Sequence, residues 1–335
     1  MLNMNVVNTI CGKKQPVYIV AEAGINHNGD LKIAKKMIEK AAKCGVNGIK
    51  FQTIFPEELF SKNQNSKLFN LIDKWSFTKL EHLELKKHSS KFGIEFLSTP
   101  VGLRSLNLLA EINIKAIKIA SGELTNIDLL KNAGKLKIPL IISTGMSTID
   151  EIIFAVQIIK KESCPFMLLH CTASYPAPIE DTHISTIPFF AKKFNVPIGY
   201  SDHTLGIDTC LATIPLGTKL IEKHFTLNKK MPGPDQKLSA DPKQLSLLVS
   251  HIRKIEKMIG IPRISVFKSE SKFRKAMRKS IVTTEDISKG TVLKKHMFTF
   301  IRPEIGMPPK EIKNILGKKA KTIIKKDTVF RKNMI

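Results

Sequence analysis

The sequence is poor in cysteine and aromatic residues, and it contains no long apolar run. Its 335 residues include 5 cysteines, which are scattered and form no Cys-x-x-Cys pair. This pattern excludes a disulfide framework and a zinc motif, so we expect each cysteine to be a small buried hydrophobic residue. No stretch approaches the roughly 18 apolar residues of a membrane span. The N-terminus also lacks the basic and then apolar pattern of a secretory signal. We therefore predict a cytoplasmic protein without a membrane segment.

Acidic residues are scarce as well. The chain has 54 Lys and Arg against 29 Asp and Glu, which gives a net charge of +25. A charge of this size first suggests a nucleic-acid partner. However, aromatic residues make up only 7% of the chain and no nucleic-acid-binding motif is present, so we expect no such partner. Three explanations of the charge stay open: a solvated basic surface, attraction of an anionic substrate, and contact with a partner subunit.

Short apolar segments recur along the chain and alternate with charged, helix-periodic segments such as 31–45 and 148–161. Strands that alternate with helices indicate a parallel sheet, and eight such units predict a closed (β/α)8 TIM barrel. The main alternative is a doubly wound open sheet, which does not need eight units and whose glycine fingerprint is absent after the first strand. The eight segments are 17–24, 48–53, 95–100, 116–123, 139–145, 166–176, 196–204 and 220–227.

The sequence changes in character after residue 260. A basic segment at 268–280 precedes short strand-like stretches, a turn at DISKGTVL (286–293) and a short helix around Pro309–Leu316. We predict a barrel domain at 1–265, a linker at 266–279 and a small second domain at 280–335. About 60 residues form a marginal core, so we expect the small domain to dock onto another surface.

Each strand-like segment begins with apolar residues and ends with polar or ionisable ones. In a TIM barrel these ends converge on the C-terminal rim, where barrel enzymes carry their active sites. Packing alone does not explain eight such ends, because an unpaired buried charge costs on the order of several kcal/mol. We therefore predict mutual pairing or a ligand at this rim. The residues are Glu22, Lys50, Gln52, Ser98, Thr99, Lys118, Ser121, Glu123, Ser143, Thr144, His170, Thr172, Tyr175, Ser201, Asp202, His203, Glu222, Lys223 and His224.

Two histidines end neighbouring strand segments, His203 the seventh and His224 the eighth. Taken singly, each is most simply a structural residue with satisfied hydrogen bonds. Adjacent strands lie about 4.8 Å apart, so the two imidazoles can share one divalent ion. An open site of this kind suits Mn, Mg, Fe or Zn as a Lewis acid. Glu222 lies two residues before His224 and points to the same side, where it can ligate the ion or orient a water.

Cations and hydroxyl groups accompany the histidines. Lys50, Lys118, Ser121, Ser143 and Ser201 can together cradle a phosphate or carboxylate. The carboxyl groups at positions 22 and 123 are candidate general acids and bases. The residues by themselves thus indicate a small anionic substrate, a metal and carboxylates, and both aldol-type condensation and hydrolysis fit this set.

A series of motifs runs in order along nearly the whole chain. They are AEAGINHNGD (21–30), IKFQT (49–53), LSTP (97–100), KIASGELTN (118–126), STGM (143–146), LLHCTASYPAP (168–178), GYSDHTLG (199–206), IEKHFTL (221–227) and PGPDQKLSADP (232–242). This series resembles the sialic acid synthase family. The tail, including IRPEIG (301–306), resembles that family's antifreeze-like SAF domain of the β-clip type.

The resemblance implies an activity and a set of roles. The family condenses phosphoenolpyruvate with an open-chain N-acetylmannosamine-type sugar, giving a nine-carbon 2-keto acid and phosphate. It implies a divalent metal, with Mn2+ expected first and Mg2+ or Co2+ as alternatives, and a domain-swapped homodimer. The implied metal ligands are His203 and His224. The implied catalytic residues are Glu22, Glu123 and Glu222, with Glu123 preferred as the base for a metal-bound water. The implied substrate-binding residues are Lys50, Gln52, Thr99, Lys118, Ser121, Ser143, Tyr175, Ser201, Asp235 and Arg302, the last reaching the partner's site.

The chain departs from the family pattern at three places. Ala173 stands where bacterial N-acetylneuraminate synthases often have Asn, and the 232–242 segment also differs from theirs. This favours members that use a 2,4-diacetamido-trideoxy sugar to make legionaminic acid, although animal sialic acid synthases have a similar CTSAYP segment. Glu304 replaces a glycine of the common RPGxG pattern. Pseudaminate synthesis and, from another class, a non-catalytic sugar-binding protein are the alternatives.

A long polar insert at 54–78 follows the second strand segment. It lies on the predicted rim, so it is either a loop that covers the substrate or an exposed helical decoration.

Overall fold

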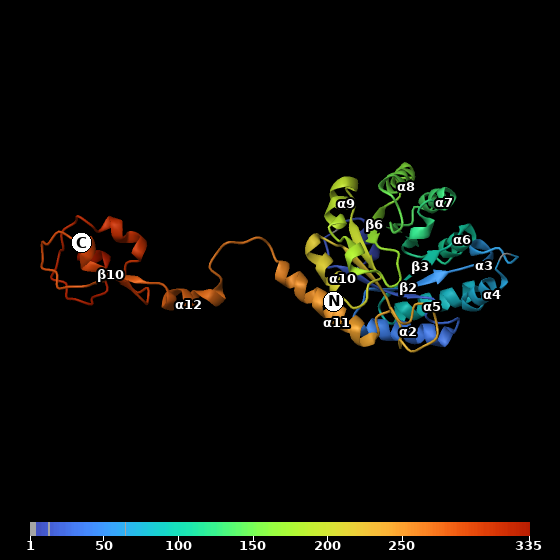
Figure 1. Cartoon of the computed structure of the whole chain (residues 1–335), viewed down its shortest axis with the longest axis horizontal. Helices are drawn as coiled ribbons and strands as arrows, with labels where there is room; N and C mark the ends of the chain where they lie inside the picture. Colours follow the sequence, from blue (N-terminus) through green and yellow to red (C-terminus); the bar gives the residue numbers. More distant parts are fainter. Residues whose placement is uncertain (1–4, 13, 64) are drawn as a thin grey trace. The chain divides into compact units, whose positions relative to one another are not determined.

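Eight parallel strands close into a barrel in sequence order, β1 to β8, and helices surround it (Figure 1). The structure is a computed structural model that describes residues 5–12, 14–63 and 65–335. The predicted TIM barrel is confirmed, and each predicted segment contains one strand. The strands are β1 (Tyr18–Gly24), β2 (Gly48–Thr53), β3 (Glu95–Pro100), β4 (Ile117–Ile119), β5 (Leu140–Ser143), β6 (Phe166–Cys171), β7 (Ile198–Asp202) and β8 (Leu220–His224).

Most of the longer helices around the barrel are amphipathic and pack an apolar side on it. In α2, for example, Met37, Ile38 and Ala41 are buried, and Asp30 caps the first turn by accepting hydrogen bonds from two backbone N–H groups. The helices of the barrel unit are α1 (Val6–Ile10), α2 (Leu31–Cys44), α3 (Pro56–Leu59), α4 (Ser66–Trp75), α5 (Lys79–Lys91), α6 (Leu103–Glu111), α7 (Ile127–Lys135), α8 (Ile149–Lys161), α9 (Thr186–Phe194), α10 (Asp208–Thr213) and α11 (Pro242–Ile259).

The N-terminal floor of the barrel is closed by α1. Val6 is fully buried, and its backbone N–H donates to the carboxylate of Glu95 at 3.0 Å. The hydroxyl of Tyr18 donates to the same carboxylate at 2.6 Å. Polar groups at this end are therefore paired with one another.

The insert at 54–78 forms the helices α3 and α4 and is anchored at both ends. Near its start, Glu58 accepts hydrogen bonds from two backbone N–H groups at the beginning of α6. At its end, the ring of Phe77 stacks on His27 with the centroids 4.3 Å apart. Gly29, with a φ of 78°, allows this approach, because a Cβ there would lie 1.9 Å from the carbonyl oxygen of Lys74.

The chain divides into two units, Met1–Gly260 and Ile261–Ile335. The second unit contains α12 (Lys268–Met277), within the predicted linker, and an antiparallel pair of strands, β9 (Ser280–Thr283) and β10 (Phe298–Ile301). The short helix expected around Pro309–Leu316 is a 3-10 helix, Pro309–Asn314. A small apolar core that includes Ile281 and Phe330 holds this unit together.

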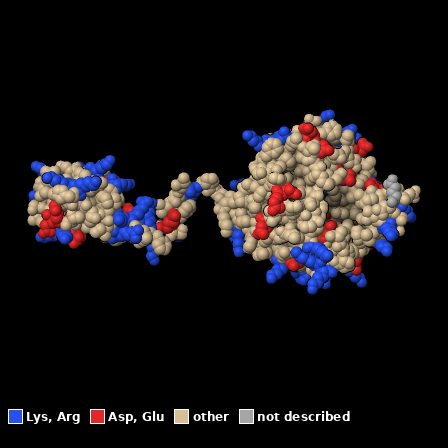
Figure 2. All heavy atoms as spheres, in the orientation of Figure 1, with Lys and Arg blue, Asp and Glu red and all other residues tan. Residues whose placement is uncertain are grey.

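The cysteines differ in their exposure to solvent. Four of the cysteines are buried, but Cys11 is exposed, so the expectation of burial is wrong for that residue. Among the described residues, no helix combines the length and apolar character needed to cross a bilayer. On the face drawn in Figure 2, Lys and Arg side chains are spread over both units among Asp and Glu.

Candidate active site

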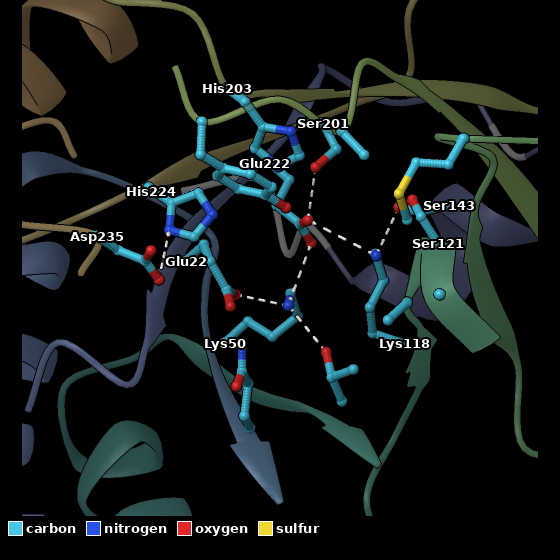
Figure 3. Close-up of a pocket in the computed structure, with 17 residues that line it drawn as sticks. Glu22, Lys50, Lys118, Ser121, Ser143, Ser201, His203, Glu222, His224 and Asp235 are labelled. Atoms are coloured by element: carbon cyan, nitrogen blue, oxygen red, sulfur yellow. Dashed lines mark hydrogen bonds and ion pairs between the residues drawn. The ribbon is translucent and has the colours of Figure 1, made fainter. Parts of the chain in front are cut away.

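A cavity opens among the C-terminal ends of the barrel strands, where the sequence predicted the site (Figure 3). Its lining residues come from all eight strands or from the loops that directly follow them. They are Glu22, Lys50, Gln52, Thr99, Lys118, Ala120, Ser121, Gly122, Ser143, Met146, Ala173, Tyr175, Ser201, His203, Glu222, His224 and Asp235.

All but two of the predicted site residues line this cavity. Glu123 does not, and its carboxylate instead accepts a hydrogen bond from the side-chain amide of Asn126 at 2.8 Å. Its catalytic role stays a prediction. Arg302 is an exposed residue of the second unit, and its predicted role likewise stays a prediction.

Some of the polar strand-end residues do not reach the cavity. Side chains alternate along a strand, so neighbours of an inward residue face the surrounding helices. The prediction that all the polar strand-end residues gather at the site is therefore wrong for the residues that face outward. The residues concerned are Ser98, Thr144, His170, Asp202 and Lys223, and also Thr172 just beyond its strand. The ring of His170, for example, hydrogen-bonds the carbonyl oxygen of Thr182.

A cluster of paired charges forms the bottom of the cavity (Figure 3). The ammonium group of Lys50 lies 2.6 Å from Glu22 Oε2 and 3.7 Å from Glu222 Oε2, and it donates to Thr99. Lys118 Nζ lies 3.7 Å from Glu222 Oε1. All four charged groups are nearly inaccessible to solvent, so their attraction is weakly screened.

Hydroxyl groups extend this cluster on both sides. Ser143 accepts a hydrogen bond from Lys118 at 2.6 Å, and Ser201 donates to Glu222 at 2.8 Å. Ser121 Oγ accepts a hydrogen bond from the backbone N–H of Gly145 at 3.0 Å. Two lysines with several hydroxyls around one opening suit a ligand that carries phosphate or carboxylate groups.

The two buried carboxyl groups respond differently to this environment. Burial raises the pKa of Glu22; Lys50 opposes the shift and Glu222 reinforces it. Burial also acts to raise the pKa of Glu222, but Lys118 and Lys50 outweigh it, so this pKa is lowered. Glu22 is thus suited to hold a proton while Glu222 stays ionised, a separation that lets one site hold an acid and a charged partner.

The two predicted histidines lie side by side with their ring centroids 5.5 Å apart. Burial lowers the pKa of His203, and it lowers that of His224 to about 3, so both rings are neutral near pH 7. His203 Nδ1 lies 2.7 Å from the carbonyl oxygen of Thr172. Since that oxygen only accepts, Nδ1 carries the proton and Nε2 keeps its lone pair.

This donor set fits a divalent ion. In His224, Nδ1 is buried and has no hydrogen-bond partner among the described residues; the nearest carboxylate, of Asp235, is 3.9 Å away. Two neutral imidazoles with available nitrogens are suitable ligands. Residues 5–12, 14–63 and 65–335 contain no group of three or more His, Cys, Asp or Glu side chains arranged to hold a metal ion.

Tyr175, Gln52 and Asp235 also line the cavity and are more exposed than the charged cluster, so they lie toward its mouth. The ring of Tyr175 packs against His203 at 4.2 Å and meets His224 edge-on at 5.8 Å. These groups combine an aromatic surface with an amide and a carboxylate, a combination suited to an oxygen-rich organic ligand.

Sequence reasoning missed three lining positions, Ala120, Gly122 and Met146, and the fit of Gly145 beside them. A Cβ at Gly145 would lie 2.8 Å from Cys171 Sγ and 2.9 Å from Ser121 Oγ. Only glycine therefore fits between these side chains. The STGM motif could have indicated this, but a glycine's neighbours in space are not visible in sequence.

Known proteins match the chain over most of its length. A model of the NeuB family matches residues 37–263, and a model of the SAF domain matches residues 278–335. The N,N'-diacetyllegionaminic acid synthase of Campylobacter jejuni is 39% identical over 93% of this chain and 98% of that protein. The N-acetylneuraminate-9-phosphate synthase of Homo sapiens is 32% identical over 97% and 94%. Relatives from Campylobacter jejuni and Helicobacter pylori are named pseudaminic acid synthases.

A solved structure agrees with these matches. The N-acetylneuraminic acid synthetase of Leptospira borgpetersenii, in complex with citrate, is 41% identical with a TM-score of 0.73 and covers 77% of this chain and 90% of its own. The barrel, the SAF domain and the named relatives all point to an enzyme, and the chain belongs to the NeuB family of nonulosonic acid synthases.

Proposed function

We propose that the enzyme condenses phosphoenolpyruvate with 2,4-diacetamido-2,4,6-trideoxymannose, releasing phosphate and N,N'-diacetyllegionaminate. N-acetylmannosamine, which would give N-acetylneuraminate, is the competing sugar. The observation that carries the proposal is the cavity itself: two lysines and several hydroxyls lie beside a carboxyl group whose pKa burial raises and two histidines whose pKa burial lowers. The choice of sugar is supported by Ala173 in the wall and by 39% identity to a legionaminic acid synthase.

The chain's own residues bind and orient the two reactants. Lys50, Lys118 and the hydroxyls beside them hold the phosphate and carboxylate of phosphoenolpyruvate, as charge-assisted hydrogen bonds favour. Gln52, Tyr175 and Asp235 at the mouth contact the sugar. A divalent ion, Mn2+ in the first instance with Mg2+ or Co2+ as alternatives, would be held by His203 and His224 and would supply Lewis acidity at the sugar aldehyde.

In the proposed reaction, Glu22 gives one proton to the sugar and regains one from water. The alkene carbon of phosphoenolpyruvate bonds to the aldehyde carbon, and the aldehyde oxygen takes the proton of Glu22 to become a hydroxyl. Water then adds to the cationic carbon that bears the phosphate, and its released proton restores Glu22. The hydroxyl proton of this tetrahedral intermediate then passes to the departing phosphate as the carbon–oxygen bond to phosphate breaks, which leaves the 2-keto acid and hydrogen phosphate. Glu222 keeps its charge throughout and holds Lys50, Lys118 and Ser201 in place.

The test uses the full chain with phosphoenolpyruvate, Mn2+ and one sugar at a time. The sugars are the two candidates and the isomer that serves as pseudaminic acid precursor. Released phosphate and product mass are measured. We expect the highest kcat/KM with the 2,4-diacetamido sugar. No condensation with any of the sugars would overturn the proposed function, and a preference for N-acetylmannosamine would overturn only the choice of sugar.

We also propose a cytoplasmic homodimer in which Arg302 of the partner subunit completes each site. The support is the resemblance, together with α12, which exposes Phe273 and Met277 and buries none of its residues. Mixing and refolding Arg302→Ala and His203→Ala chains tests it. If Arg302 acts across subunits, mixed dimers have one intact site, and about a quarter of wild-type activity returns. No recovery, or a monomeric mass in solution, would contradict the exchange.

A further inference from the structure

A buried ion pair lies directly behind the two histidines, on the face of β7 and β8 that is turned away from the cavity. Lys223 Nζ is 2.7 Å from Asp202 Oδ2, and the two side chains are 1% and 0% exposed. In the register of the two strands, Asp202 stands opposite Lys223. The proposed mechanism uses neither residue, although a buried charge pair is energetically demanding and replaceable by apolar side chains in many proteins.

The pair also holds the backbone just after His203. The N–H of Thr204 donates to Asp202 Oδ1 at 3.0 Å, and the carbonyl oxygen of Thr204 accepts from Lys223 Nζ. His203 therefore lies between two residues that this network fixes. The hydroxyl of Tyr200 and the thiol of Cys210 also approach the Asp202 carboxylate, at 3.4 Å and 3.1 Å.

The inward neighbours of this pair are the proposed ligands and anchors of the site. His203 follows Asp202 in the chain, and His224 follows Lys223. One step back, Ser201 stands opposite Glu222 and donates to it at 2.8 Å. The ion pair thus joins the two strands at the level of the histidines. His224 depends on its strand in particular, because Nδ1 lacks a hydrogen-bond partner in the described part of the chain.

We propose that Asp202 and Lys223 are positioning residues: their ion pair sets the spacing and orientation of His203 and His224 that a shared divalent ion requires. The inference rests on the proposed function, since it assumes that the histidines hold the ion. A small displacement of either imidazole matters because a metal site tolerates little error in the position of its ligands. Lys50 and Lys118 extend from β2 and β4, so the phosphoenolpyruvate contacts depend much less on this pair.

The experiment compares the wild-type chain with Asp202→Asn/Lys223→Met, which removes both charges and leaves neither unpaired. Mn2+ affinity is measured by calorimetry without substrate, and kcat and the KM for phosphoenolpyruvate are measured separately. Lys223→Arg keeps the charge. Tyr18→Phe is the matched control, because it removes a buried 2.6 Å hydrogen bond at the opposite end of the barrel.

We expect the double variant to fold, to bind Mn2+ at least tenfold more weakly and to lose at least tenfold in kcat, with the KM for phosphoenolpyruvate within threefold of wild type. Lys223→Arg should recover part of the affinity, and Tyr18→Phe should leave both quantities unchanged. In metal-free protein, the 15N signals of the His203 ring should report the Nδ1–H form in wild type and a mixture of forms in the double variant.

Three outcomes would overturn the inference. The folded double variant could keep Mn2+ affinity and kcat within twofold of wild type. Alternatively, the Tyr18→Phe control could lose as much Mn2+ affinity and kcat as the double variant does. All variants of the pair, Lys223→Arg included, could fail to fold, which would make the pair a support of the fold rather than of the histidines. If wild type and His203→Ala bind Mn2+ equally, the proposed metal site fails instead, so the two failures are distinguishable.

Discussion

The inner and outer faces of β7 and β8 both carry buried polar residues, but the hydrogen-bonding groups of these residues are satisfied to different degrees. On the outer face, Asp202 and Lys223 are fully buried and make short contacts with each other and with the backbone. On the inner face, His203 and His224 are buried almost as deeply, but one ring nitrogen of His224 lacks a hydrogen-bond partner within the described ranges. The two faces are therefore not distinguished by depth of burial. They are distinguished by whether their buried polar atoms have hydrogen-bond partners.

The difference indicates how to recognise a site among buried polar residues. A satisfied buried pair offers a ligand nothing, because its hydrogen-bonding capacity is already used. A carboxyl group with a raised pKa and an imidazole kept neutral by burial retain unused capacity, and here they line an opening. A single substitution that breaks the outer pair should therefore cost mainly stability, and a single substitution on the inner face should cost mainly turnover.

The largest expected effect is on the outer face. Lys223→Met leaves the Asp202 carboxylate buried without its cation, which should lower the free energy of unfolding by about 3–5 kcal/mol. Chemical denaturation of the metal-free protein measures this loss. Asp202→Asn in the same chain should restore much of the stability, because no unpaired charge is left. A loss below about 1 kcal/mol, which is the range of an exposed pair, would contradict the idea that the outer face contributes mainly to stability.

The next effect is on the inner face. His203→Ala should lower kcat by at least about 100-fold, since Lewis-acid stabilisation is worth several kcal/mol. The unfolding free energy should change far less than in Lys223→Met. Phosphate release at saturating Mn2+ measures the first quantity, and denaturation measures the second. A wild-type kcat in this variant would contradict the proposal that His203 is a metal ligand.

Glu22→Gln tests the proton on the same face. The amide preserves the shape of the side chain but has no carboxyl proton to give, so kcat should fall by about 100-fold, the lower end of general acid–base effects. Binding of phosphoenolpyruvate should persist, because Lys50 and Lys118 remain. If Glu123→Gln instead causes the larger loss, the proton is handled by Glu123, which was expected as the base and does not line the cavity.

The smallest expected effect is on the choice of sugar. Ala173→Asn places a longer polar side chain in the cavity wall and should shift the ratio of kcat/KM values toward N-acetylmannosamine by about tenfold, within the 1–3 kcal/mol that pocket contacts supply. Ala173→Ser is the matched, smaller change. An unchanged ratio would show that the wall at this position does not select the sugar.

The sequence predicted much of this arrangement, and its errors at the site concern the direction in which side chains point. Apolar runs of similar length located all eight strands, and the spacing of His203 and His224 brought them together correctly. The set of polar strand ends was too broad, because a strand shows which residues alternate without showing which face is the lumen. Glu123 was predicted inside the cavity and lies beyond it, on a short 3-10 turn (Ser121–Glu123) that redirects the chain.

Local pattern was thus enough to determine the barrel, the rim that carries the chemistry and the residue types gathered there, since periodicity and strand order are properties of neighbouring residues in the chain. Only the tertiary structure decided the partners: that Lys223 binds Asp202, that Lys50 lies between two carboxylates, and that burial raises the pKa of one of these. The reason is physical. Desolvation and Coulomb interactions depend on distances between strands, and the sequence specifies those distances only through the fold.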